Sequence, residues 1–177
     1  MAELAVKSYH TRVWERVFVV VGCGGTGSIL AEGLANMVAG YKINARMVLV
    51  DHDLVEEKNV FRQNFMPSEI GQNKAEALAF RLNLRFGLDI GALAQEVTKK
   101  PANDAAIYIT AVHTVTPRKL FKDSRFWLDL GNDKSTGQAI FGTTSNASLL
   151  KQEAKNWNKQ PYVMSLPNAY YRAEMEK

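Results

Sequence analysis

The stretch that decides the fold is VFVVVGCGGTGS, residues 17–28. Its first five residues form a short apolar run rich in β-branched side chains, which is typical of a strand buried on both faces of a parallel sheet. The glycines that follow allow the backbone to turn tightly and to approach a phosphate closely. Residues 29–40 then place apolar side chains at helical spacing, so we expect strand, glycine loop and helix in direct succession.

The alternation of strand and helix continues along the chain. Residues 47–50 predict a second buried strand that closes on Asp51, and a helix is predicted from about Asn73 to Phe86, ended by Gly87. Further buried strands are expected at residues 106–112, 126–130 and 138–141. This pattern predicts an α/β, Rossmann-like nucleotide-binding fold with a mostly parallel mixed sheet flanked by helices. The length of 177 residues fits a single domain, residues 1–177.

Composition excludes several classes of protein. Lys and Arg are spread along a chain of net charge +4, with no run of like charge that would indicate a nucleic-acid-binding arm. No stretch approaches the ~20 apolar residues of a membrane helix. The single cysteine, Cys23, rules out an internal disulfide and a four-cysteine zinc site, so we expect a cytoplasmic protein without zinc. We interpret Cys23 as a packing residue and not as a nucleophile.

The glycine loop lies where a nucleotide site would need it, between a strand and a helix. The free N–H groups and the positive dipole end of that helix favour an anion. We therefore expect a nucleotide, the alternative being a glycine-rich turn with no ligand. Asp51 can accept hydrogen bonds from ribose hydroxyls, and to this point an NAD-dependent oxidoreductase and an ATP-using enzyme fit equally well. The glycines expected to bind the nucleotide are Gly22, Gly24, Gly25 and Gly27.

An irregular polar segment separates these two possibilities. It begins with DHDLVEEKNVFRQ at residues 51–63, and GQNK follows at residues 71–74. With the glycine loop before them, these motifs make residues 17–133 resemble the ThiF/MoeB-like adenylyltransferases, which are ubiquitin-activating-enzyme-like. The order Gly-Asn-Asp followed by Gly-Gln, within residues 131–138, looks closest to prokaryotic members. The resemblance implies a homodimer that uses ATP and Mg²⁺ to activate a C-terminal carboxylate on a ubiquitin-like or sulfur-carrier-like protein.

The resemblance also implies which side chains bind ATP. Asp51 would hold the ribose, and the phosphates would be held by Asn59, Arg62 and Lys74. In adenylation a carboxylate attacks the α-phosphate of ATP and pyrophosphate leaves, so cations must gather where negative charge builds up.

The individual residue types suit this reaction. Arg62 can clamp phosphate oxygens bidentately and Lys74 acts as a point charge, which makes these two the candidate catalytic residues. Gln63 can hydrogen-bond phosphate or ribose, and Asp53 would lie near the same site without an assigned role. Taken singly, Lys74 could be a solvated helix residue, and Arg62 could form a surface ion pair with the neighbouring glutamates.

The chain departs from the family pattern where an aspartate usually holds magnesium. His113 stands at that position, and a neutral imidazole is a poor magnesium ligand. The metal ligand is therefore unknown, with Asp129 and Asp133 as candidates. The alternative function is a catalytically impaired nucleotide-binding scaffold or regulatory module. An NAD-dependent oxidoreductase is disfavoured because it leaves the cation and amide side chains of the polar segment unexplained.

The ends of the chain carry two further expectations from the resemblance. Relatives have an N-terminal arginine that reaches the partner subunit's ATP site, for which Arg12 and Arg16 are the candidates. The motif SLPN at residues 165–168 resembles the start of a segment that continues in relatives. The chain could therefore be a short form or a fragment that lacks a C-terminal substrate-binding segment.

Overall fold

The computed structural model describes residues 16–100, 106–121, 124, 126–132 and 137–142. Arg12, Asp133 and the motif at residues 165–168 lie outside these ranges. Within them, no helix is both long enough and apolar enough to cross a membrane.

One twisted sheet organises the described part of the chain. Its six strands follow the order β3-β2-β1-β4-β5-β6. All neighbouring pairs are parallel except β5 and β6, which are antiparallel, so the predicted mostly parallel mixed sheet is confirmed. The strands are β1 (Arg16–Val21), β2 (Ala45–Val50), β3 (Gly91–Leu93), β4 (Ala106–Thr110), β5 (Phe126–Asn132) and β6 (Gly137–Gly142).

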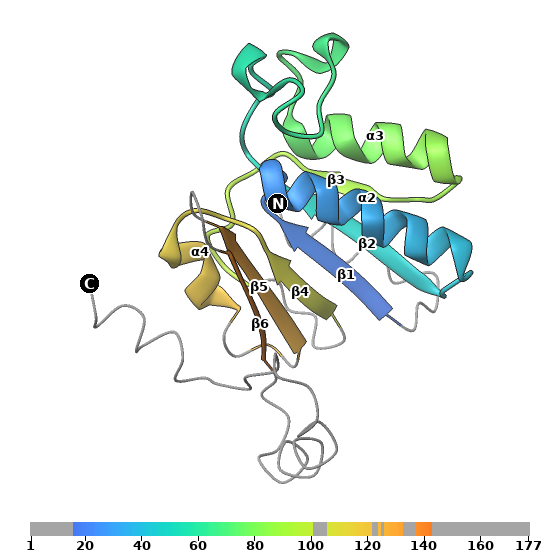
Figure 1. Ribbon diagram of the computed structural model, residues 1–177. Coiled ribbons are helices and arrows are strands. Elements are labelled where there is room, and N and C mark those ends of the chain that lie inside the picture. The colour runs from blue at the N-terminus through green and yellow to red at the C-terminus, as the bar shows by residue number, and fades with distance from the viewer. Residues whose placement is uncertain (1–15, 101–105, 122–123, 125, 133–136, 143–177) are drawn as a thin grey trace, which may run out of the picture.

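Helices cover the sheet on its two sides (Figure 1). Phe18 and Val20 of β1 belong to the apolar cluster beneath α2 and α3, whereas Val19 and Val21 belong to a second cluster that contains Phe121, next to α4. Because successive side chains of a strand point to opposite faces, this burial accounts for the unbroken apolar run of β1. The helices are α2 (Gly25–Gly40), α3 (Lys74–Phe86) and α4 (Val115–Leu120).

The predicted helix after the polar segment is confirmed with its end signals. Asn73 precedes α3, and its side-chain oxygen accepts hydrogen bonds from the N–H groups of Ala75 at 2.9 Å and Glu76 at 3.2 Å. This satisfies two of the four N–H groups that a helix start leaves open. Gly87 ends the helix in the left-handed conformation at φ 65°, which favours glycine.

The sequence analysis missed strand β3 and predicted β4 two residues too long. The three residues Gly91–Leu93 have low intrinsic strand propensity, and they become a strand because they pair in parallel with Val48–Val50 of β2. β4 ends at Thr110 because the backbone turns there into the loop before α4, although the N–H of Ala111 still donates to Val21 of β1 at 2.8 Å.

Two glycines of the loop after β1 are required by backbone geometry. Gly22 has φ +91°, and a Cβ there would lie 2.6 Å from the carbonyl oxygen of Ala111. A Cβ at Gly27 would overlap the carbonyl group of Gly22. A Cβ at Gly24 or Gly25 would meet no atom within 4 Å, so neither position needs glycine to avoid a clash.

This difference predicts unequal costs for two similar substitutions. Gly27→Ala should lower the free energy of unfolding by about 3 kcal/mol, because the added methyl group displaces backbone atoms. Gly24→Ala, three residues earlier and just before α2, should change it by no more than about 0.5 kcal/mol. Urea unfolding followed by circular dichroism measures both. Equal costs would contradict this account of the loop.

Candidate functional site

A cleft of about 560 Å³ opens at the carboxyl ends of β1, β2 and β4. β1 and β4 are sequence-distant neighbours at the centre of the sheet, where open α/β sheets form their ligand crevice. Both predicted catalytic cations line this cleft together with the glycine loop. The predicted residues that line it are Gly22, Gly24, Gly25, Asp51, Asp53, Arg62, Gln63, Lys74 and His113.

Two of the predicted binding residues lie outside the cleft lining. Gly27 is buried at the start of α2, where it packs against the backbone of Gly22. Asn59 is 3% exposed, and its side-chain oxygen accepts a hydrogen bond from the N–H of Glu56 at 2.9 Å. Gly27 and Asn59 therefore contact the backbone near the cleft, at Gly22 and Glu56, and do not line the cleft themselves.

Asp51 connects the glycine loop to the turn after β2. Its side chain is 9% exposed, and its two carboxylate oxygens accept hydrogen bonds from the N–H of Cys23 at 2.6 Å and the N–H of Asp53 at 2.9 Å. The N–H of Gly22 donates to Val50 at 2.8 Å beside them. Each carboxylate oxygen has a second lone pair, so these contacts leave acceptor capacity for a ribose hydroxyl.

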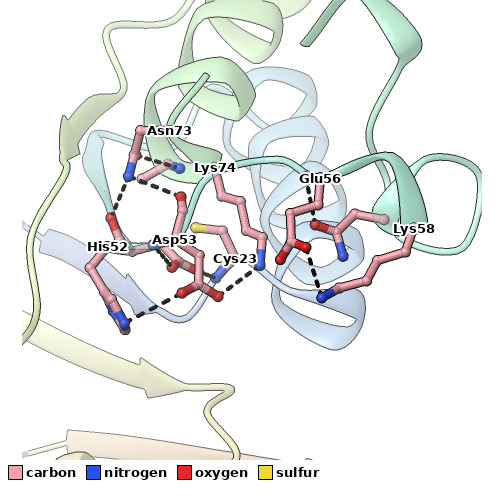
Figure 2. A network of polar contacts seen from close by, with 10 residues as sticks. Cys23, His52, Asp53, Glu56, Lys58, Asn73 and Lys74 are labelled. Atoms are coloured by element: carbon pink, nitrogen blue, oxygen red, sulfur yellow. Dashed lines mark hydrogen bonds and ion pairs between the residues drawn. The ribbon is translucent and has the colours of Figure 1, made fainter. Parts of the chain in front are cut away.

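Lys74 and Asp53 form an ion pair in the cleft (Figure 2), with 2.8 Å between Nζ of Lys74 and Oδ2 of Asp53. The Lys74 side chain is only 7% exposed, so this residue is not a solvated helix lysine. The hydrogen bond from Lys74 lowers the pKa of Asp53 and outweighs the opposing effect of burial. His52 approaches the other oxygen of Asp53 at 3.3 Å. The pair therefore presents a buried cation beside an ionised carboxylate.

Arg62 and Gln63 reach the cleft from the segment between two short 3₁₀ turns, Glu57–Asn59 and Pro67–Glu69. Arg62 is exposed, and its Nε donates to the carbonyl of Lys58 at 3.2 Å. The ion pair that the structure shows for Glu56 is with Lys58, at 2.8 Å. The side-chain oxygen of Gln63 is buried and has no hydrogen-bond partner among the described residues.

The wall beyond β4 holds a cation that the sequence analysis did not identify. Arg118 of α4 lines the cleft, and its Nε donates to the carbonyl of Val112 at 3.0 Å. Its Nη1 lies 3.3 Å from Oδ2 of Asp129. Asp129 is fully buried and lies outside the cleft lining, and its Oδ1 accepts a hydrogen bond from the hydroxyl of Thr110. His113 is exposed at the cleft on the same side.

Residues 95–97 are a second part of the cleft that the sequence analysis did not find. They follow β3, the strand that it missed, so no predicted strand end pointed to them. Arg118 also gave no signal in the sequence, because its place at the cleft depends on the turn between β4 and α4. Both depend on tertiary pairing that residue spacing along the chain does not encode.

Within the described ranges, which leave out the candidate Asp133, the donors of the cleft do not form a dedicated magnesium site. Asp51, His52 and Asp53 bring their ligand atoms within 4.8 Å of one another. However, the cation of Lys74 already lies on Asp53, which disfavours a second cation between these side chains. His113 offers nitrogen where magnesium prefers oxygen. Asp129 lies outside the cleft lining and is paired with Arg118, so it is not placed to hold the ion.

Cys23 has the surroundings of a packing residue. It is fully buried, and this burial is the main cause that raises the pKa of its thiol, with the charge of Asp51 acting in the same direction. A thiol kept protonated is neither a nucleophile nor a metal ligand. The prediction that Cys23 is structural agrees with these surroundings.

The strand order, the glycine loop and the cleft together define a Rossmann-like α/β domain of the doubly wound kind. A sequence profile of the ThiF family matches residues 9–116, which is more than half of the chain. The chain therefore belongs to the ThiF family.

Curated relatives share part of this chain. Ubiquitin-like modifier-activating enzyme 5 of Aedes aegypti is 34% identical over 83 residues, which are 47% of this chain and 20% of that protein. The enzyme of the same name from Drosophila ananassae is 38% identical over 78 residues, covering 44% and 18%. The matched region thus spans about a fifth of the length of these relatives.

Solved structures are similar in fold. The crystal structure of E. coli MccB with succinimide matches with a TM-score of 0.61 and 18% identity, covering 87% of this chain and 51% of that one. The structure of PaaA matches with a TM-score of 0.60 and 19% identity, covering 76% and 44%. Both agree with the Rossmann-like arrangement described above.

The Lys74–Asp53 pair predicts a dependence of stability on pH. The pKa of Asp53 is lowered in the folded protein, so its contribution is present above the unfolded pKa of about 3.9 and is lost as pH falls through the folded value. Asp53→Asn should lower the free energy of unfolding at pH 7 by on the order of 1 kcal/mol, because the carboxylate is half exposed. Urea midpoints should converge for the two proteins in acid; a constant gap would contradict the pairing.

Proposed function

We propose that this protein is an ATP-dependent adenylyltransferase that activates the C-terminal carboxylate of a ubiquitin-like or sulfur-carrier-like protein. The observation that carries the proposal is that the glycine loop, Arg62 and Lys74 line one cleft. A glycine loop at the start of a helix suits a dinucleotide as well as ATP. Two cations from separate elements that face it suit a triphosphate.

In this proposal the residues act by position and charge. The N–H groups of the loop before α2 bind phosphate, and Asp51 accepts from the ribose. Arg62 and Lys74 stabilise the charge that builds up as the acceptor's carboxylate oxygen bonds to the α-phosphorus and the bond to pyrophosphate breaks. Gln63 lines the same part of the cleft and offers an amide for a neutral hydrogen bond.

A nucleotide-binding scaffold or regulatory module is the second candidate. The observation that favours it is the pair His113 and Asp129: the first replaces the carboxylate expected of the family, and the second is buried in contact with Arg118 and Thr110. Under this alternative ATP binds and no adenylate forms.

Pyrophosphate exchange into ATP separates the two candidates. With a candidate acceptor protein that ends in glycine, we expect exchange by the wild-type protein, and we expect Lys74→Met to lower its rate by about 10²–10³-fold. Lys99→Gln, an exposed cation outside the cleft lining, is the control and should leave the rate unchanged. Protection of the wild type against heat by ATP without exchange supports the scaffold, and greater protection by NAD supports an oxidoreductase.

The substitution His113→Asp tests the departure from the family pattern. We expect it to raise the exchange rate about tenfold at saturating magnesium, since a carboxylate is a better magnesium ligand than imidazole. His113→Asn is the matched control, because it removes the imidazole without adding charge. A rate that does not rise in His113→Asp shows that His113 does not limit the reaction.

The same proposal includes the location and assembly of the protein. We infer a cytoplasmic homodimer whose partners are ATP and the acceptor protein, with no nucleic acid and no membrane. Analytical ultracentrifugation with and without ATP measures the oligomeric state directly, and a monomer under both conditions contradicts that part of the proposal.

A further inference from the structure

Polar contacts hold the segment that carries Arg62 and Gln63. We call residues 60–66 the Arg62 segment. Phe61 is 88% exposed and has φ +60°, the left-handed region that a bulky side chain rarely adopts. The N–H of Arg62 donates to the carbonyl of Val60 at 2.7 Å across this tight turn. Such a backbone persists only when its surroundings fix it in place.

Arg81 of α3 provides side-chain contacts to this segment, in addition to the segment's own backbone hydrogen bonds and the burial of Phe65. Its Nη2 donates to the main-chain carbonyl of Asn64 at 2.5 Å and its Nη1 to the Asn64 side chain at 3.3 Å. Its Nε binds Glu69 at 2.9 Å, and the other oxygen of Glu69 accepts the N–H of Met66 at 2.7 Å. The guanidinium of Arg81 therefore contacts the Arg62 segment directly at Asn64 and, through Glu69, at Met66.

Asn64 extends this grip to the helix that follows the glycine loop. Its N–H donates to the hydroxyl of Ser28 at 3.3 Å, and its side-chain nitrogen donates to Glu32 at 2.5 Å. Both partners belong to α2, whose N-terminus borders the cleft. Arg81 thus joins α3, the Arg62 segment and α2 in one hydrogen-bonded network, although it lies outside the cleft lining itself.

We propose that Arg81 is a positioning residue that sets the affinity for the triphosphate by fixing the Arg62 segment against the cleft. This inference rests on the proposed function for its ligand. The Arg81 side chain is 18% exposed and that of Glu69 is 9% exposed, so solvent does not replace these contacts easily. A planar fork with several donors is required, which lysine does not provide.

The test measures binding of ATP and of AMP, which lacks the outer phosphates. Arg81→Gln should weaken ATP binding about ten- to hundredfold, the range of a lost charge-assisted hydrogen bond, and should leave AMP binding unchanged. Arg81→Lys should behave like Arg81→Gln, because it retains the charge and loses the fork. Lys99→Gln, an exposed cation outside both the cleft lining and this network, is the control and should bind ATP normally.

A double-mutant cycle decides whether Arg81 acts through Arg62. In the Arg62→Ala background, Arg81→Gln should cause little further loss of ATP affinity. The same loss in both backgrounds, equal losses for ATP and AMP, or normal binding by Arg81→Lys would each overturn the inference. If Arg81→Gln fails to fold because Glu69 is left buried without its partner, Glu69→Gln/Arg81→Gln removes both charges and serves in its place.

Hydrogen exchange separates this inference from the proposed function. In Arg81→Gln, backbone amides of residues 60–66 should exchange faster while those of β1 and β2 keep their protection. If the wild-type protein binds no ATP, the proposed function is overturned, and so is the statement that Arg81 sets ATP affinity. The exchange data then still test whether Arg81 fixes residues 60–66. Unchanged exchange in residues 60–66 overturns the anchoring.

Discussion

The carboxylate of Asp51 is the contact on which the cleft depends. It accepts the N–H groups of Cys23 and Asp53, which belong to loops that follow two different strands. A hydrogen bond to an ionised acceptor is shorter and stronger than one between neutral groups, and these amides would otherwise be left unsatisfied. A single side chain thereby fixes the glycine loop relative to the end of β2, and this is a reason for a carboxylate here that does not require a ribose.

The hydrogen bonds around residues 51–53 extend to the start of α3. The side-chain nitrogen of Asn73 donates to the carbonyls of Asp51 at 2.9 Å and Asp53 at 3.1 Å, while its oxygen caps the helix. Lys74 then occupies the first turn of α3, where the helix dipole disfavours a cation. The ion pair with Asp53 offsets this cost. The structure thus keeps a nearly buried lysine at the edge of the cleft through a dedicated partner.

The sequence predicted the parts of this molecule that depend on local pattern. The apolar run of β1, the glycines after it and the end signals of α3 are readable because burial, φ angles and capping act over a few residues. β3 was not readable, since Gly91–Leu93 form a strand only beside β2. Lys74 was identified as a cation, but its burial and its pairing depend on the turn that Asp53 makes. Arg81 and Arg118 act entirely through tertiary contacts.

The two walls of the cleft use their cations differently. Arg118 faces the buried carboxylate of Asp129 and donates to the carbonyl of Val112, so its charge is compensated within the protein. Arg62 is exposed, and its Nε contacts a main-chain carbonyl. Of these two arginines, Arg62 is therefore the one that no carboxylate of the described residues is shown to pair with, in a cleft that Asp51 and Asp53 also line. Under the proposed function, Arg62 is therefore the arginine available to the triphosphate, whereas Arg118 ties α4 to the buried carboxylate of β5.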